Sequence, residues 1–518
     1  MPFTLKVAIF MEAMALARHL RSLPFKVQVS AALPILGERR LTTELDMRNQ
    51  NHENDFWSDV LGKITERGRQ WLGRLPANDP GSSVRIGELA ASLMSTKGEA
   101  SGVAMARAVV EEWQAMDSSA RNAWFAILAE EFGPDEEKLA AAVDSWLADP
   151  TPEAAQKLHD AAESLRQELL RRINLAPQGT AALVSMRAVL LDLMKTSPAL
   201  AAVDADFVHL LASWFNRGFL LLRPIDWSSP ADILEKIIQY EAVHAIRDWD
   251  DLRRRLKPPD RRCFAFFHPQ MPQDPLIFVE IALTSGIPGD IGELLSEERA
   301  SIDPREADTA VFYSISNTQV GLRGISFGNF LIKQVVEELL RDMPWLKNFV
   351  TLSPIQGFVA WLQAQRRDGR ENILAFGDGL DEIDHTGWHQ ETAKRRAMAP
   401  LLEKAAAIYL VEGKGANRRP LDPVARFHLG NGARLERIHA SGDLSPKGLS
   451  QSHGVMVNYL YDPKAIEKNH EIYADTGDVV HSSAVRKILA SDTGAIVRNI
   501  QTLLSSEKPR KKKEVKSR

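Results

Sequence analysis

Two segments of the sequence carry residue types that are suited to acid–base chemistry. Ser353 lies in "TLSPIQGF" and His428 lies in "RFHLGNGA". A histidine has an ordinary pKa of about 6.5, so it can donate or accept a proton near neutral pH. A serine hydroxyl can donate to a substrate carboxylate or accept from it. The surroundings of Ser353 lack the G-x-S-x-G pattern, so we do not expect an acyl-serine intermediate.

Each of these residues also has an ordinary structural interpretation. Ser353 precedes Pro354, and the residue before a proline favours extended backbone, so this serine could simply end a strand. His428 precedes the turn-forming "GNG", where a histidine is often a hydrogen-bonded side chain without a catalytic role. The residues alone leave both interpretations open.

A third segment, "RGISFGN" at Arg323–Asn329, contains residues that could hold a phosphate. The first backbone N–H groups of a helix have no internal partner and bind anions well. Gly324 and Gly328 lack a Cβ, Ser326 adds a hydroxyl and Arg323 adds a positive charge. The segment matches neither the P-loop nor the G-x-G-x-x-G pattern. The spacing therefore allows either a phosphate-binding turn or a tight turn into a core helix.

The elements around this turn predict where it lies in the fold. A strand is expected at "TAVFYSIS" (309–316), then the turn, then a helix that begins near Phe330 and ends before Pro344. The strand "NFVTLSP" (348–354) follows. The helix has one apolar stripe, which predicts burial against the core: Leu331, Ile332, Val335, Val336 and Leu339.

The remaining chain divides into two parts by its periodicity. Apolar residues at helical spacing run from about residue 56 to 198, with helix-start signals in "DSSARNAW" and "DPTPEAAQKL". After about residue 203, helices alternate with β-rich runs at 262–268, 275–284, 426–440 and 455–462. We predict a loosely ordered arm (1–50), an all-α domain (51–202), a mixed α/β domain (203–505) and a basic disordered tail (506–518).

Composition limits the class of protein. The 518-residue chain has 44% hydrophobic and 25% charged residues, values typical of a globular protein. Its one cysteine, Cys263, excludes an intrachain disulfide and a cysteine-rich metal cluster. His385 and His389 have no third ligand at metal spacing, so no metal is expected. No apolar run is long enough to span a membrane, and we expect a cytoplasmic protein without a membrane partner.

Charge is uneven along the chain. The net charge is −4, although the segment 508–518 carries seven Lys or Arg and one Glu. The rest of the chain is therefore acidic, which argues against a dedicated nucleic-acid binder.

Several longer segments resemble malonyl-CoA decarboxylases. They are "FYSISNTQVGLRGISFGNFLIKQVVEELLRDMPWLKNFVTLSPIQGF", "LDPVARFHLGNGARLERI", "DLSPKGLSQSHGVMVNYLYD", "LLASWFNRGFLLLRPIDWSSPADILEKI" and "EAVHAIRDWDDLRRRL". The resemblance covers most of residues 204–462. In addition, "RGISFG" is similar to the R/Q-x-x-G-x-G/A loop of the GNAT acyl-CoA superfamily, although Ser326 replaces its central glycine.

The resemblance implies a GNAT-like mixed α/β catalytic domain behind the helical domain. It implies that Ser353 accepts and His428 donates a proton while malonyl-CoA becomes acetyl-CoA and CO2, without a metal or redox cofactor. Tyr461 matches a family tyrosine with no firm role. The resemblance further implies self-association through the helical domain, with a tetramer as a candidate assembly. The CoA loop of the family falls on Arg323, Gly324, Ile325, Ser326, Phe327, Gly328 and Asn329.

Two other functions remain open at the level of the sequence. A GNAT-type N-acyltransferase would use the same loop, but it needs a base for an acceptor amine, and no such residue set is evident. A non-catalytic CoA-binding scaffold would use the helical domain as its interaction module. The sequence also leaves open whether the physiological role is malonate use or control of fatty-acid synthesis. The terminal "KSR" lacks a Ser-Lys-Leu peroxisomal signal, in line with the cytoplasmic expectation.

Overall fold

The computed structural model of the chain describes residues 81–96, 98–327, 331–370, 373, 375–377, 379–385 and 387–506. The arm predicted at 1–50 lies outside the described residues. So does the tail predicted at 506–518, apart from its first residue. Two residues of the predicted CoA loop, Gly328 and Asn329, also lie outside them.

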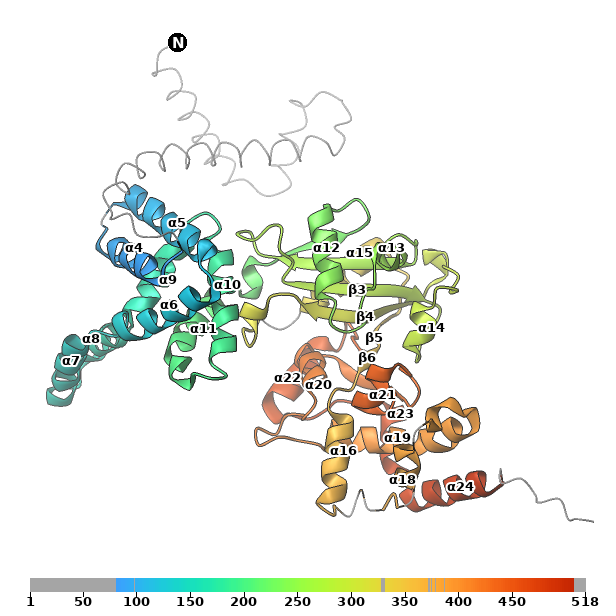
Figure 1. Cartoon of the computed structure of the whole chain (residues 1–518). Coiled ribbons are helices and arrows are strands. Elements are labelled where there is room, and N and C mark those ends of the chain that lie inside the picture. Colours follow the sequence, from blue (N-terminus) through green and yellow to red (C-terminus); the bar gives the residue numbers. More distant parts are fainter. Residues whose placement is uncertain are drawn as a thin grey trace, which may run out of the picture. The chain divides into compact units, whose positions relative to one another are not determined.

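The described chain is helical up to Trp214 (Figure 1). Two predicted helix starts are confirmed. The Asp117 side chain accepts from the N–H of Ala120 at 2.8 Å, and that of Thr151 accepts from the N–H of Ala154 at 3.2 Å. Each cap satisfies a donor that the first helical turn leaves free. The helices are α4 (Ser83–Ser95), α5 (Glu99–Ala115), α6 (Ser118–Glu131), α7 (Glu136–Ala148), α8 (Pro152–Ala162), α9 (Leu165–Asn174), α10 (Gly179–Leu193), η1 (Pro198–Leu200) and α11 (Ala201–Trp214).

The change to mixed structure comes later than the sequence indicates. The boundary predicted between residues 202 and 203 falls inside α11, and the first strand begins only at Leu221. Phe207 and Leu211 of α11 are buried, so this helix packs against the interior of the protein. The all-α and mixed α/β classes are confirmed, and the division into domains stays a prediction.

Eight strands of the described chain form one mixed sheet in the order β1-β2-β3-β4-β5-β8-β6, with β7 paired to β8. Strands β1 to β4 are antiparallel neighbours, whereas β4 and β5 are parallel. The strands are β1 (Leu221–Ile225), β2 (Arg261–Phe267), β3 (Ile277–Thr284), β4 (Thr309–Asn317), β5 (Asn348–Thr351), β6 (Ser353–Pro354), β7 (Arg434–His439) and β8 (Met456–Leu460).

The parallel pair β4–β5 separates along its length. Only Thr309–Phe312 of β4 pair with Asn348–Thr351 of β5, and β4 continues to Asn317. The connection between them contains η4 (Val320–Leu322), the glycine-bearing loop and α15 (Leu331–Asp342). The five residues of the predicted apolar stripe are all buried in α15. The predicted strand–turn–helix–strand order is therefore confirmed, with a short 3-10 turn added before the loop.

Helices α12 (Ala231–Tyr240) and α13 (Trp249–Leu256) pack on one face of the sheet. Their buried leucines and isoleucines contact Cys263, Ala265 and Phe267 of β2. These three residues alternate along β2, as expected for side chains on one face of a strand. A second cluster joins α14 (Ile291–Leu295) to β4, β5 and β8.

The described chain after β6 is mainly helical, and its helices α19, α20 and α23 contact β7. No helix in the described ranges has an apolar stretch long enough to cross a membrane. The remaining helices are η2 (Arg217–Phe219), η3 (Pro304–Glu306), α16 (Phe358–Arg367), α18 (Gly379–Asp384), η5 (Trp388–Gln390), α19 (Thr392–Val411), α20 (Pro423–Gly430), α21 (Pro446–Ser452), α22 (Ile466–Thr476), α23 (Ser483–Ala490) and α24 (Thr493–Ser506).

Two sequence predictions about strands need correction. The run 426–440 was expected to be β-rich, but its first part belongs to α20, because Asp422 caps this helix and Pro423 occupies its first turn. The run 348–354 was expected as one strand, but it divides into β5 and β6 on either side of Leu352.

Candidate active site

Ser353 is held in an extended backbone by its pairing with β8. It lies opposite Val457 of that strand, and Pro354 lies opposite Met456. The residue before a proline favours this conformation. Leu352 lies between the two short strands, and its N–H donates to the Phe312 carbonyl of β4 at 3.0 Å, which continues the parallel β4–β5 ladder by one bond. Ser353 is therefore fixed between β8 and the end of β5, as the sequence predicts for a strand end.

His428 reaches Ser353 from the last turn of α20. Its Nε2 lies 3.2 Å from the Ser353 Oγ. Asp422 fixes the start of this helix by accepting from the N–H of Ala425 at 2.8 Å. The His428 ring stacks on Tyr459 of β8, with ring centroids 4.7 Å apart. The two residues singled out for acid–base chemistry are thus in hydrogen-bond contact although 75 positions separate them in the sequence.

Two further side chains extend this contact into a chain of hydrogen bonds. The Tyr461 Oη lies 2.8 Å from the His428 Nδ1, and the Ser353 hydroxyl donates to the Thr351 Oγ1 at 2.9 Å. Thr351 also accepts from the N–H of Tyr459 at 3.1 Å. If Tyr461 donates to Nδ1, then His428 carries its proton on Nε2 and donates to Ser353. This tautomer satisfies every polar group in the chain from Tyr461 to Ser353.

Burial controls the protonation of these groups. His428 is 3% exposed and Ser353 6%. Burial alone lowers the pKa of His428 to about 3, which makes the imidazole neutral in the free protein near neutral pH. Burial also raises the pKa of Tyr461 well above its ordinary value, so its hydroxyl keeps its proton. Tyr461 is therefore suited to orient His428 and poorly suited to transfer a proton.

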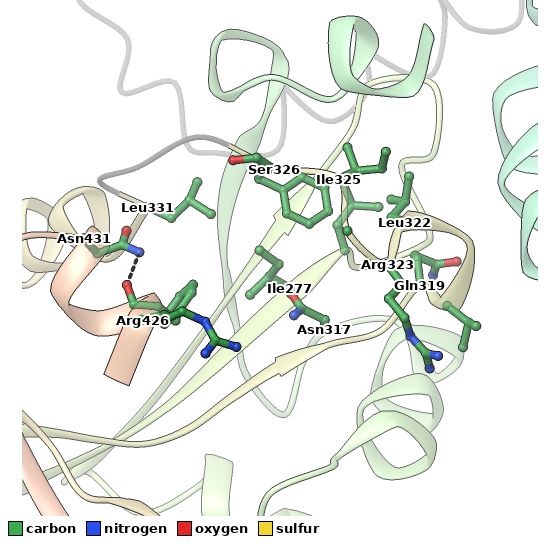
Figure 2. A pocket seen from close by; sticks show the side chains of 16 residues that line it. Ile277, Asn317, Gln319, Leu322, Arg323, Ile325, Ser326, Leu331, Arg426 and Asn431 are labelled. Atoms are coloured by element: carbon green, nitrogen blue, oxygen red, sulfur yellow. Dashed lines mark hydrogen bonds between the residues drawn. The ribbon is translucent and has the colours of Figure 1, made fainter. Parts of the chain in front are cut away.

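A cavity of about 410 Å³ lies beside the predicted CoA loop (Figure 2). Arg323, Gly324, Ile325, Ser326 and Phe327 all line it. The other lining residues come from η4, from the ends of β3 and β4, from Leu331 of α15 and from α20. Figure 2 shows the Arg426 side chain entering from α20 and that of Arg323 from the loop, with Ile277 and Asn317 between them.

The cavity and the buried pair adjoin the same helix but are separate. Arg426, Phe427 and Gly430 of α20 and the following Asn431 line the cavity, whereas His428 and Ser353 do not. The Phe427 ring packs edge-on against His428 with a centroid distance of 5.1 Å. Helix α20 therefore connects a solvent-accessible cavity to a dry site.

The two arginines of the cavity differ in how they are held. The Arg426 Nη1 donates to the carbonyls of Pro420 and Leu421 at 2.8 and 2.7 Å. Among the described residues, the Arg323 guanidinium has no hydrogen-bond or ion-pair partner. Both side chains are exposed, so each has donors available for an anion.

Sequence reasoning missed Arg426, Thr351 and the contact of Tyr461 with His428. Thr351 precedes Ser353 by two positions and shares its side of the strand, which was the available signal. Nothing in the local sequence indicates Arg426, because its importance depends on how α20 packs beside the loop. The described residues contain no group of three His, Cys, Asp or Glu side chains placed to hold a metal ion.

Comparison with known families matches two adjoining segments of the chain. Residues 132–215 match the malonyl-CoA decarboxylase N-terminal domain, and residues 218–499 match the malonyl-CoA decarboxylase C-terminal domain. The second match alone covers more than half of the chain.

Individual relatives agree with this match. The chain is 37% identical to the mitochondrial malonyl-CoA decarboxylase of Anser anser anser over 310 residues, 56% of this chain and 61% of that protein, somewhat less than two thirds of its length. It is 34% identical to the Rattus norvegicus enzyme of the same name, over 70% of this chain and 80% of that one.

Solved structures of two bacterial malonyl-CoA decarboxylases are also similar. The Rhodopseudomonas palustris protein has a TM-score of 0.75 and 53% identity, and the Agrobacterium vitis protein has a TM-score of 0.74 and 51% identity. Each comparison covers 79% of this chain and 100% of the other. The chain belongs to the malonyl-CoA decarboxylase family.

Proposed function

We propose that the protein decarboxylates malonyl-CoA to acetyl-CoA and CO2, with Ser353 and His428 as the catalytic residues. The observation that carries the proposal is the buried 3.2 Å contact between Ser353 and His428. It lies beside a cavity lined by a loop suited to CoA. Family membership supports a CoA thioester as the substrate.

The chemistry needs stabilisation of charge and one proton donor. Breaking the bond to the carboxylate releases CO2 and leaves an electron pair on the α-carbon, which the thioester carbonyl delocalises as an enolate. The carbonyl is itself the electron sink, so no redox cofactor is required. Hydrogen-bond donors near its oxygen stabilise the growing charge. A general acid then protonates the α-carbon to give acetyl-CoA.

We assign the donor role to His428 and the acceptor role to Ser353. With Tyr461 donating to Nδ1, the proton on His428 Nε2 faces the Ser353 hydroxyl. Burial keeps the imidazole neutral, so the proton that it donates is the one on Nε2 of a neutral ring. Loss of CO2 leaves the enolate, whose α-carbon is much more basic than the malonyl carboxylate and takes this proton. One proton from solvent then replaces it in each turnover.

We assign substrate binding to the loop and to α20. Arg323, Gly324, Ile325, Ser326 and Phe327 would hold the diphosphate of CoA, together with Gly328 and Asn329, which lie outside the described residues. Arg426 would add a second cation from the opposite side of the cavity. Arginine suits this role because its planar donors match phosphate oxygens.

The direct experiment is to incubate the purified protein with malonyl-CoA alone and measure acetyl-CoA and CO2. We expect stoichiometric formation of both without an added acceptor. Failure to form either product would overturn the proposal. An N-acyltransferase would instead leave malonyl-CoA unchanged until an acceptor amine is supplied, and a non-catalytic scaffold would bind CoA without turnover.

We also propose that the helical domain, predicted at 51–202, mediates homo-oligomerisation. Several large apolar side chains are exposed in its described part, among them Leu147 (74%) and Leu175 (66%). Exposed apolar side chains that gather into one patch mark contacts between proteins. Sedimentation equilibrium tests this proposal, and a monomer at micromolar concentration would contradict it. A tetramer is the assembly that we expect.

We propose a cytoplasmic location for the protein. Its single cysteine, Cys263, is buried and unpaired, and burial raises the pKa of this thiol well above its ordinary value. A protein without disulfides fits a reducing compartment. Cell fractionation with an antibody to the native protein tests this location.

A further inference from the structure

The helical part of the chain contacts the predicted CoA loop through one buried arginine. Arg187, on α10, is 2% exposed. Its Nη1 donates to the carbonyls of Gly321 and Arg323 at 2.7 and 2.8 Å. These carbonyls belong to η4 and to the first residue of the loop. A side chain of the helical part thus binds the backbone of a segment that lines the cavity.

Arg187 is itself held in place from α11. Its Nε lies 2.8 Å from the Asp204 Oδ1, and its Nη2 lies 3.5 Å from the Asp204 Oδ2. The carboxylate therefore takes one side of the guanidinium, and the two loop carbonyls take the other. Such charge-assisted hydrogen bonds fix the orientation of the guanidinium as well as its distance from the loop.

Two packing contacts hold the same loop against the helices. A Cβ on Gly321 would lie 1.9 Å from the Val184 carbonyl oxygen of α10, so only glycine permits this approach. At the other end, the ring of Phe327 meets that of Phe215 edge-on, with centroids 6.5 Å apart. The loop is therefore attached to the helical part at both ends.

Holding the Arg323 carbonyl determines where the next N–H points. In a trans peptide the C=O of one residue and the N–H of the next point in opposite directions. Arg187 binds the Arg323 carbonyl, so the N–H of Gly324 points away from the helices. In the part of the chain that the structure describes, this N–H has no hydrogen-bond acceptor. Gly324 has a φ of +81°, which favours glycine, and it lines the cavity.

We propose that Arg187 is a positioning residue for the substrate: it holds the loop so that the Gly324 N–H donates to a phosphate of the CoA thioester. This inference rests on the proposed function, because it assumes that the cavity binds the nucleotide end of malonyl-CoA. The helical part then has a role in substrate binding in addition to any role in self-association.

The test compares two substrates in R187Q, namely malonyl-CoA and S-malonyl-pantetheine, which lacks all the phosphates. In R187Q the KM for malonyl-CoA rises and kcat changes little, because the contact acts on binding. We expect kcat/KM for malonyl-CoA to fall about tenfold to a hundredfold, the usual effect of losing a hydrogen bond to a charged group. The value for S-malonyl-pantetheine stays near that of the wild type.

Arg166 on α9 offers a matched control. It is also buried, at 6% exposure, and it binds Asp206 of α11 at 2.7 Å and the Leu128 carbonyl at 3.0 Å. R166Q therefore removes a similar buried ion pair that does not contact the loop. We expect R166Q to lower stability. The ratio of kcat/KM for malonyl-CoA to kcat/KM for S-malonyl-pantetheine should stay at its wild-type value. An equal change of that ratio in R166Q and R187Q overturns the proposal, as does an unchanged ratio in R187Q.

Two milder variants keep the test decisive if R187Q does not fold. R187K retains a positive charge with one donor group, and D204N loosens the guanidinium without removing it. Both variants should lower the ratio of kcat/KM for malonyl-CoA to that for S-malonyl-pantetheine, as R187Q does, but by a smaller factor. The affinity for CoA itself, measured by calorimetry in wild type and R187K, separates the two proposals. A wild type that binds CoA without decarboxylating malonyl-CoA contradicts the proposed function, whereas equal CoA affinity in both proteins contradicts the role of Arg187.

Discussion

The site around His428 and the cavity beside the loop differ in both charge and exposure to solvent. His428, Ser353 and Tyr461 are buried and neutral, and burial is the only cause of the lowered pKa of His428. The cavity instead carries two exposed arginines, Arg323 and Arg426. Both regions adjoin α20, so one helix separates two environments of opposite character.

This difference matches the two ends of the proposed substrate. The phosphates of CoA carry negative charge before and after the reaction, so cations that bind them improve affinity without changing the barrier. The malonyl carboxylate loses its charge as CO2 leaves. A site without a fixed cation does not hold this carboxylate strongly, and it therefore favours the neutral product over the ionised substrate. Positive charge near the phosphates therefore improves affinity, and its absence near the acyl group avoids stabilising the ionised substrate.

The largest effect should come from removing the neutral pair. We expect S353A and H428N each to lower kcat about a thousandfold with little change in KM, the usual size of a lost general acid–base group. Steady-state release of acetyl-CoA measures this. S314A is the control, because the equally buried Ser314 hydroxyl bonds to Glu241 instead. Wild-type turnover in both S353A and H428N would contradict the assignment and show that other residues carry the reaction.

A smaller effect should follow from removing the partner of Nδ1. Y461F deletes the hydroxyl that lies 2.8 Å from His428, so the tautomer is no longer fixed. We expect kcat to fall about tenfold, the effect of one neutral hydrogen bond. Y459F is a close comparison, because the Tyr459 ring stacks on His428 while its buried hydroxyl has no partner among the described residues. Both variants keep their rings, so equal losses in Y461F and Y459F would show that the effect does not come from the hydrogen bond to Nδ1.

The sequence predicts the local parts of this arrangement better than the contacts between them. The stripe from Leu331 to Leu339 repeats at helical spacing, and all its members are buried in α15. The prediction of β structure from Arg426 onward is wrong because Asp422 and Pro423, which start a helix, precede this run and its apolar residues are few. The predicted strand divides because pairing with β4 ends at Thr351 and Ser353–Pro354 pair with β8 instead, which depends on the position of β8.

The features that the sequence does not predict depend on contacts between residues far apart in the chain. Ser353 and His428 were selected from a family resemblance, since neither has a distinctive local pattern. Their distance depends on β8, which pairs with β6 and ends next to Tyr461. Arg187 is separated from Gly321 by 134 positions, and its neighbours in the sequence do not distinguish it from an ordinary helix arginine. Only the packed fold identifies such residues.

Acid should weaken the fold through His428. Its pKa is about 3 in the folded protein against 6.5 for the free side chain, so the unfolded chain binds one more proton between these values. The stability contributed by the neutral ring is present above about pH 6.5 and is lost as the pH falls toward 3. The expected loss is about 1.4 kcal/mol per pH unit. Urea unfolding at pH 6.5 and 5 should show a steeper loss in wild type than in H428N, and parallel losses would contradict the burial of a neutral ring.

The smallest effects should come from single cations of the cavity, because exposed charges are screened by water and salt. We expect R426Q to raise the KM for malonyl-CoA about fivefold and R323Q about twofold, with kcat unchanged in both. Arg426 should matter more because the carbonyls of Pro420 and Leu421 already hold its guanidinium, so binding an anion costs it less side-chain entropy. R107Q, which removes an exposed arginine paired with Glu111 on α5, is the control. Both KM effects should shrink as ionic strength rises. A fall in kcat for R426Q would instead show that this cation acts on the acyl group, and the separation of a charged binding region from a neutral reaction site would not hold.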